Sequence, residues 1–130
     1  MNKPTYAPVR RRTRKEIQTA LSSGKASEIR DALISAGYWK DDWQWAQQQL
    51  VNFSQYDDDL VLWAVATGFG FIGAFNGAVD ENIVGPILIR LKAHSSASVS
   101  GAAEEAEADI EHFVRHRRDD EDIDLAERLS

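Results

Sequence analysis

The side chains of this sequence that could carry out chemistry are three histidines and a large set of carboxylates. His112 and His116 lie four residues apart and Asp109 precedes them by one turn, so a helix would present all three on one face. This spacing could hold a metal ion. No HExxH motif and no cysteine supplies further ligands, however, and a solvated helix face is the alternative. We therefore expect no bound metal.

Catalytic groups are harder to find. Nucleophilic catalysis needs an activated side chain beside a base, and this sequence has no cysteine and no GxSxG elbow. Its serines, histidines and aspartates show no spacing from which a catalytic triad could be inferred. Pairs of carboxylates are common, but without a predicted pocket they do not indicate acid–base catalysis. We expect that the protein is not an enzyme.

One stretch matches a cofactor-binding motif by its letters alone. Residues 68–73 read Gly-Phe-Gly-Phe-Ile-Gly, which fits the GxGxxG dinucleotide fingerprint. The fingerprint requires a preceding strand and an acidic residue about twenty positions later. Here the stretch lies inside a helical apolar run, and Arg90 and Lys92 stand at the later position. We expect the glycines to let helices pack closely, and we expect no cofactor.

The distribution of charge predicts the kind of partner. The net charge is −6, and residues 41–89 contain seven acidic side chains and no basic one. Nucleic-acid binding relies on Lys and Arg that neutralise phosphates, so this excess of acid disfavours a nucleic-acid ligand. A basic protein is the expected partner.

Two kinds of residue are candidates for contacting that partner. Trp39 and Trp43 fall in a loop and at a helix start, where either an interface role or core packing is possible, whereas Trp45 and Trp63 are predicted to be core. Many carboxylates stand at expected helix starts, where capping and the helix dipole explain part of the set but not three consecutive acids. Others form a stripe on the last long helix, for which a solvated face is the alternative. The predicted partner-binding residues are Trp39, Asp41, Asp42, Trp43, Asp57, Asp58, Asp59, Asp80, Glu81, Glu104, Glu107 and Glu111.

The elements that must position these side chains are helices, because the apolar residues recur with a helical period and no strand-like alternation is found. Glycines at 24, 37 and 77 are the expected stops, and short connections favour antiparallel neighbours. The predicted helices are Thr13–Leu21, Ala26–Ala36, Asp42–Ser54, Asp58–Phe75, Glu81–His94 and Ser98–His116.

The chain also contains an internal repeat. A shift of 38 residues superposes apolar positions in pairs, and a shift of 32 relates the first two helices to later ones. The clearest pairs at 38 are Leu50 with Leu88, Val61 with Val99, Ala64 with Ala102, Ile72 with Ile110, and Phe75 with Phe113.

A pattern that resembles the paired helices of HEAT repeats runs from residue 59 to residue 91. It comprises the run Asp-Leu-Val-Leu-Trp-Ala-Val-Ala-Thr-Gly at 59–68, then Ile72, Gly73, Val84, Pro86, Leu88 and Leu91. Leu62 departs from the pattern, since the family usually has Arg there. The chain from 13 to 114 is similar to small bacterial HEAT-like proteins, some of which are immunity proteins encoded beside polymorphic or contact-dependent toxin genes.

The resemblance implies an all-α fold, a short right-handed stack of about three antiparallel helical hairpins (a HEAT-like α-solenoid). It also implies a protein-binding module, most simply an immunity protein that neutralises a toxin domain, such as a nuclease, encoded by a neighbouring gene. A HEAT-like adaptor or regulatory subunit is the alternative, because such repeats host many binding roles. The expected organisation is a flexible basic arm (1–12), the helical domain (13–116) and a charged tail or short capping helix (117–130).

Residues 60–79 carry no charge and could be taken for a membrane span. Asn76 and Gly77 shorten the apolar helix, and an acidic triplet rather than Lys or Arg flanks it. The central helix of a stack is covered on both sides and should be apolar nearly all round. We expect a core helix, no membrane partner, and a cytoplasmic protein, in line with the absence of cysteine and of an apolar stretch after the basic start.

Overall fold

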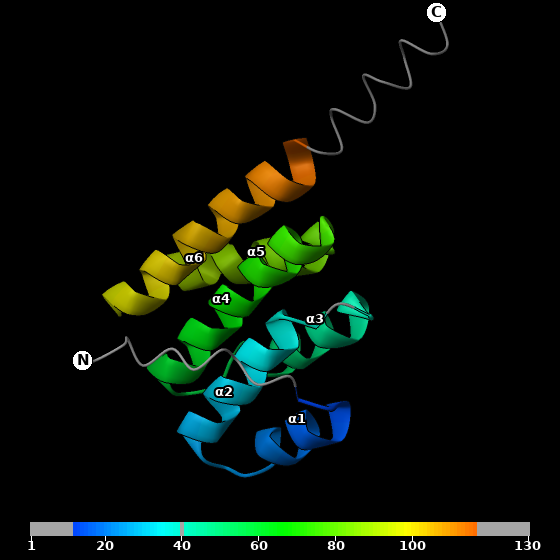
Figure 1. The fold of residues 1–130 in the computed structure, drawn as a ribbon. Coiled ribbons are helices and arrows are strands. Elements are labelled where there is room, and N and C mark those ends of the chain that lie inside the picture. Colours follow the sequence, from blue (N-terminus) through cyan, green and yellow to red (C-terminus); the bar gives the residue numbers. More distant parts are fainter. Residues whose placement is uncertain (1–11, 40, 117–130) are drawn as a thin grey trace, which may run out of the picture.

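The computed structural model describes residues 12–39 and 41–116, and all the regular structure in these ranges is helical (Figure 1). Predictions for residues 1–11 and 117–130 fall outside the described residues. The helices are α1 (Arg14–Leu21), α2 (Ala26–Gly37), α3 (Trp43–Asn52), α4 (Asp59–Asn76), α5 (Glu81–Lys92) and α6 (Ala97–Ile110), which continues into the π-helical turn η1 (Glu111–Arg115).

Local capping explains where most helices begin. Thr13 starts α1 with a capping box, in which its hydroxyl accepts from the Glu16 backbone N–H and the Glu16 carboxylate accepts from the Thr13 N–H. Asp42, Asp58 and Asp80 accept backbone N–H groups in the first turns of α3, α4 and α5. The predicted helix starts at these acids are therefore confirmed.

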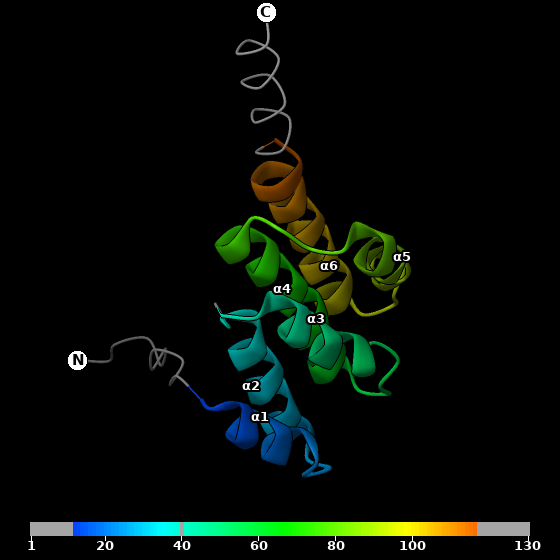
Figure 2. The same cartoon turned by 90° about the vertical axis from the view of Figure 1, so that its right-hand side faces the viewer.

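Helix α4 lies at the centre of the molecule, between α2 on one side and α6 on the other (Figures 1 and 2). The shorter α1 packs on α2, α3 packs on both α2 and α4, and α5 packs mainly on α6. Helices α4 and α6 run in the same direction, since the backbone at Gly70 faces Ala106 and that at Gly73 faces Ile110. Helices α2, α4 and α6 thus form one layer.

Glycines allow this layer to pack closely. A Cβ atom built on Gly68 would lie 2.7 Å from a Leu50 methyl group, and one built on Gly70 would lie 3.1 Å from the Ala106 Cα. The interpretation of the 68–73 glycines as packing residues is confirmed. Gly37 was predicted to be a helix stop, but it is the buried last residue of α2, where a Cβ would lie 3.0 Å from the Gly68 Cα. Close approach of two backbones, and not a positive φ, is what requires glycine there.

A different glycine does act as a stop. Gly77 has a φ of +65°, and its N–H donates to the Gly73 carbonyl, which closes the end of α4. The predicted end of this helix at Asn76-Gly77 is confirmed. The last helix differs from its prediction as a single α-helix to His116, because its final turn widens into η1 after Ile110.

The core follows the 38-residue register found in the sequence. Leu50 and Leu88, Val61 and Val99, and Ile72 and Ile110 are all buried as pairs. In the same register Phe75 and Phe113 are both exposed, at 48% and 40%. These four pairs of positions, 38 residues apart, therefore share the same degree of burial.

One described helix, Asp59–Asn76, is long and apolar enough to cross a membrane by length and composition. Its mean hydropathy is 1.4, and 56% of its residues are buried inside the protein. The burial shows that much of its apolar surface is covered by the other helices, as expected for the central helix of this fold.

Candidate protein-binding surfaces

The predicted acids at helix starts lie at two opposite ends of the helices. Asp42 and Asp80 cap α3 and α5, whose beginnings lie together, because the Asp80 N–H donates to the Gln47 side chain at 2.8 Å. Asp58 caps α4, which begins where α3 ends. The helix-start carboxylates thus do not form a single edge.

Trp39 and Trp43 are both partly buried and pack against the core. Near Trp39, the Arg14 guanidinium lies over the rings of Trp39 and Trp45, at 5.7 and 4.7 Å from their centroids. Arg14 also donates to the Asp42 carboxylate at 3.0 Å. The Trp39 indole N–H is buried and has no hydrogen-bond partner among the described residues.

Two hydrogen bonds from within the chain hold the Asp42 carboxylate. Hydrogen bonds from the Trp45 backbone N–H and from Arg14 lower the pKa of Asp42 below its usual value. At the other end, Asp59 lies 3.8 Å from His94 Nε2, whereas the exposed Asp57 has no hydrogen bond or ion pair with another described residue. Asp41 is exposed as well.

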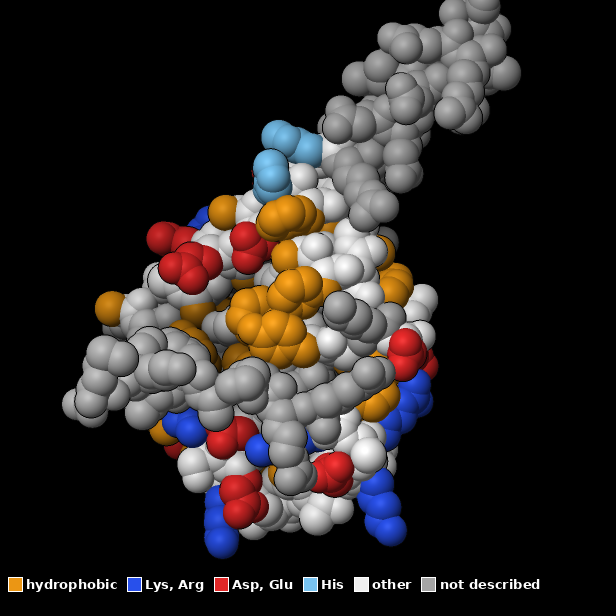
Figure 3. Space-filling view, in the orientation of Figure 1, with side chains coloured by type: hydrophobic (Ala, Val, Ile, Leu, Met, Phe, Trp, Pro, Cys, Tyr) orange, Lys and Arg blue, Asp and Glu red, His pale blue; other side chains and the backbone are white. Residues whose placement is uncertain are grey.

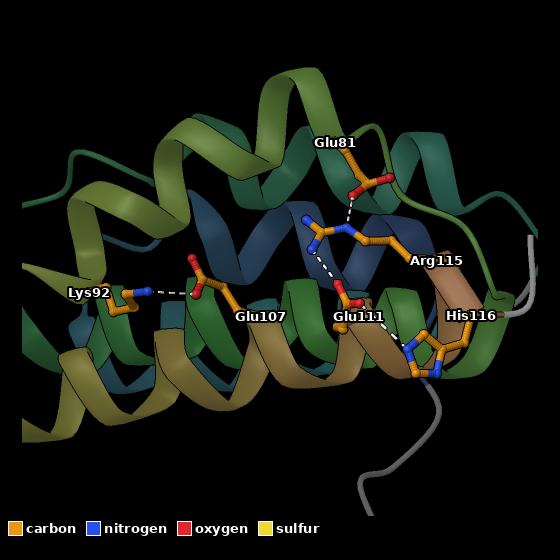
Figure 4. Close-up of polar contacts among 6 residues, drawn as sticks. All are labelled: Glu81, Lys92, Glu107, Glu111, Arg115 and His116. Carbon is orange, nitrogen blue, oxygen red and sulfur yellow. Dashed lines mark hydrogen bonds and ion pairs between the residues drawn. The ribbon is translucent and has the colours of Figure 1, made fainter. Parts of the chain in front are cut away.

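The acidic stripe of the last helix faces α5 and is largely paired (Figure 4). Arg115 donates to Glu81 at 2.6 Å and also pairs with Glu111, which raises the pKa of Arg115 and lowers that of Glu111. Lys92 donates to Glu107 at 2.8 Å, which raises the pKa of Lys92. We call these five residues the ion-pair seam. Glu104 is exposed beside it.

In the ion-pair seam, cations of the same chain pair with some of the carboxylates that were predicted to contact a partner. Each carboxylate paired with an internal cation presents less net charge to an outside partner. The prediction that these residues contact a partner remains a prediction, and the internal pairs are what a partner would have to compete with.

A second surface was not singled out in the sequence. Tyr38 lies 4.7 Å from Phe71 and 5.1 Å from Phe75, measured between ring centroids, and the two phenylalanines lie 5.8 Å apart. Tyr38, Phe75 and Phe113 are all more than a third exposed. This layer of α2, α4 and α6 therefore leaves aromatic rings open to the outside.

Acidic side chains border these rings. The Asp109 carboxylate lies beside Gly70, 3.2 Å from where a Cβ would stand, and Glu105 is one turn away on the same helix. Figure 3 shows hydrophobic side chains at the centre of this view, with acidic and histidine side chains along α6 above them. We call the whole surface the aromatic face: Tyr38, Phe71, Phe75, Glu105, Asp109 and Phe113.

A signal for this face existed in the 38-residue register. Thr67 and Phe71 of the charge-free helix superpose on Glu105 and Asp109 of the amphipathic one. The polar residues of the later copy mark the outward side of α4, which its own composition does not reveal.

The described residues offer little for a metal ion. Among them, no group of three or more His, Cys, Asp or Glu side chains is placed to hold one. His112 instead lies edge-on to Phe113, with centroids 4.6 Å apart, and His116 lies 3.5 Å from Glu111.

The structure is similar to one chain of the crystal structure of a CDI (contact-dependent inhibition) complex from Cupriavidus taiwanensis LMG 19424. The TM-score is 0.72 with 26% sequence identity, and the match covers 85% of this chain and 98% of that chain. No protein-family model matches the sequence, and the search of curated proteins gives no match. The chain therefore shares its fold, over almost the full length of the neighbour, with a component of a CDI complex.

Proposed function

We propose that this protein is an immunity protein, which binds a toxin domain encoded by a neighbouring gene and neutralises it. The observation that carries the proposal is the structural likeness to a chain of a CDI complex over 98% of that chain. A likeness that extends over a whole small chain favours a shared role more than one limited to a single hairpin does.

The fold we propose is a short HEAT-like solenoid of three hairpins, α1–α2, α3–α4 and α5–α6. The shared burial of positions 38 residues apart supports it, as does the single layer made by the second helix of each hairpin. Repeat stacks of this kind present broad surfaces to protein partners.

The proposed mode of action is binding without catalysis, in the cytoplasm, against a basic toxin domain. The net charge of −6 supports a basic partner, because complementary charge speeds encounter. A nuclease is the toxin class to test first, since an active site that binds phosphates is basic.

Coexpression with the C-terminal domain of the neighbouring gene's product tests this function. Cells producing that domain should survive only when this protein is present, and the two should copurify. A toxin domain of an unrelated system serves as the control and should kill in both cases. A non-toxic neighbour, or killing despite abundant folded protein, would replace this proposal with that of a HEAT-like adaptor.

A further inference from the structure

The aromatic face has an apolar half on the α2 side of α4 and an acidic half on the α6 side. Phe71 and Phe75 lie with Tyr38 on the α2 side of α4, while Asp109 lies on the α6 side, beside Gly70. Gly70, the residue before Phe71, has no side chain, and the Asp109 carboxylate lies 3.2 Å from where its Cβ would stand. A planar group could therefore contact a ring and the carboxylate together.

The carboxylates of the acidic half are not neutralised by a close ion pair. The side chain of neither Asp109 nor Glu105 forms a hydrogen bond or an ion pair with another described residue. Asp109 is partly buried, and this desolvation together with the nearby Glu105 raises the pKa of Asp109, an effect that His112 opposes. A cation brought from outside would offset the repulsion from Glu105 and stabilise the ionised form of Asp109.

We propose that the aromatic face docks an arginine of the partner toxin domain, flanked there by apolar side chains. This inference rests on the proposed function and names the site at which it operates. The guanidinium pairs with Asp109 and Glu105, and its plane lies along the rings of Phe71 and Tyr38. The apolar neighbours of the arginine cover Phe75 and Phe113.

Arginine fits this surface better than lysine does. Its planar guanidinium stacks on aromatic rings and can donate two parallel hydrogen bonds to one carboxylate, whereas an ammonium group is a compact and strongly hydrated charge. Aromatic and arginine residues together are also those most often found at the energetic centre of interfaces.

Binding of the purified toxin domain from the neighbouring gene, measured by calorimetry, tests the site. Phe75→Ser and Asp109→Asn should each weaken binding by about 10- to 100-fold. The matched controls are Ile89→Ser on α5, where the side chain is 65% exposed, and Asp31→Asn at an exposed aspartate of α2, and both should bind like the natural protein. Circular dichroism melts establish that every variant is folded.

If the natural protein binds and protects but the two face variants bind equally well, the inference is overturned while the proposed function stands. Light scattering adds a second criterion. The protein should be monomeric, and a dimer that Phe75→Ser dissociates would show that a second copy occupies the face, which also overturns the inference.

A peptide probe separates the site from the toxin. The peptide acetyl-Leu-Arg-Leu-amide, titrated into isotope-labelled protein, should shift the amide signals of Tyr38, Phe71 and Asp109. The same peptide with citrulline, a neutral analogue of arginine, should bind more weakly. With these shifts but no toxin binding, the proposed function fails and the arginine site remains; without them, the site is overturned whatever the toxin does.

Discussion

The two sides of α6 use acidic residues in opposite ways. Toward α5, Glu107 and Glu111 belong to the ion-pair seam and are paired with Lys92 and Arg115. Toward the aromatic face, the carboxylates of Glu105 and Asp109 form no ion pair with a described residue, and only the more distant His112 charge opposes the raised pKa of Asp109. One helix therefore carries one acidic surface that is satisfied within the fold and another that is not.

This difference teaches that the density of acidic residues is a poor guide to a binding surface. Carboxylates at helix starts cap the helices, and those in the seam form ion pairs within the chain. A carboxylate that is partly desolvated and lacks a cation costs the free protein stability, which an incoming cation can restore. The less conspicuous pair on α6 is thus the better candidate for contact.

The largest expected change is a loss of overall stability, which would unfold the ion-pair seam and the aromatic face together. Ala102 is buried in α6, so Ala102→Asp places a charge in the core and should lower the free energy of unfolding by about 3–5 kcal/mol. Chemical denaturation followed by circular dichroism measures it. Gly101→Asp is the control, because nothing lies within 4 Å of its added Cβ, and a similar loss there would remove burial as the explanation.

A smaller loss of stability is expected when only the ion-pair seam is changed. Arg115→Gln removes the pairs with Glu81 and Glu111 and should lower the melting temperature by about 1–4 °C, because exposed ion pairs contribute little. Toxin binding should stay unchanged. A double-mutant cycle with Glu81→Gln isolates the pair, and strong loss of binding in Arg115→Gln would shift the interface to the seam.

The acidic start of α4 provides a kinetic comparison with the aromatic face. Asp57→Lys combined with Asp59→Lys leaves the Asp58 cap intact and should slow association by about threefold while weakening its salt dependence. Dissociation should change little, in contrast to the variants of the aromatic face. Stopped-flow measurements at two salt concentrations distinguish the two, and a large change in dissociation would make this end part of the interface.

The smallest expected effect is a gain of stability, when the charge of Asp109 is removed. The folded-state pKa of Asp109 is raised, so its ionised form is penalised above that pKa, and the penalty disappears as the pH falls toward the ordinary value of 3.8. Asp109→Asn should therefore raise the melting temperature at pH 7 by about 1–2 °C, with the gain shrinking near pH 4. A gain independent of pH would mean that desolvation of the charge is not its cause.

The helices could be predicted because their signals are local. Asp42, Asp58 and Asp80 each cap the helix that they precede, and Gly77 closes α4 through its own backbone conformation. The correspondence between positions 38 residues apart could likewise be found, because apolar residues recur at that spacing in the sequence. These features depend on residues a few positions apart or on repetition.

The surfaces could not be predicted in the same way because they depend on distant contacts. Arg115 pairs with Glu81 across 34 residues, and Gly37 is required by Gly68, which no local pattern reveals. In α4, Phe69 is buried and Phe75 is nearly half exposed, yet both look like core residues in a charge-free run. Only the neighbouring helices decide which side of α4 stays open.

The glycine contacts also determine how the aromatic face can respond to a partner. At Gly37–Gly68 and at Gly70–Ala106 the backbones of α2 and α6 approach that of α4 closely, which fixes the spacing of the three helices. The rings and carboxylates are then held in a preorganised arrangement before any partner arrives. Little backbone entropy remains to be lost on binding, so the affinity of the face should be governed by side-chain complementarity and desolvation.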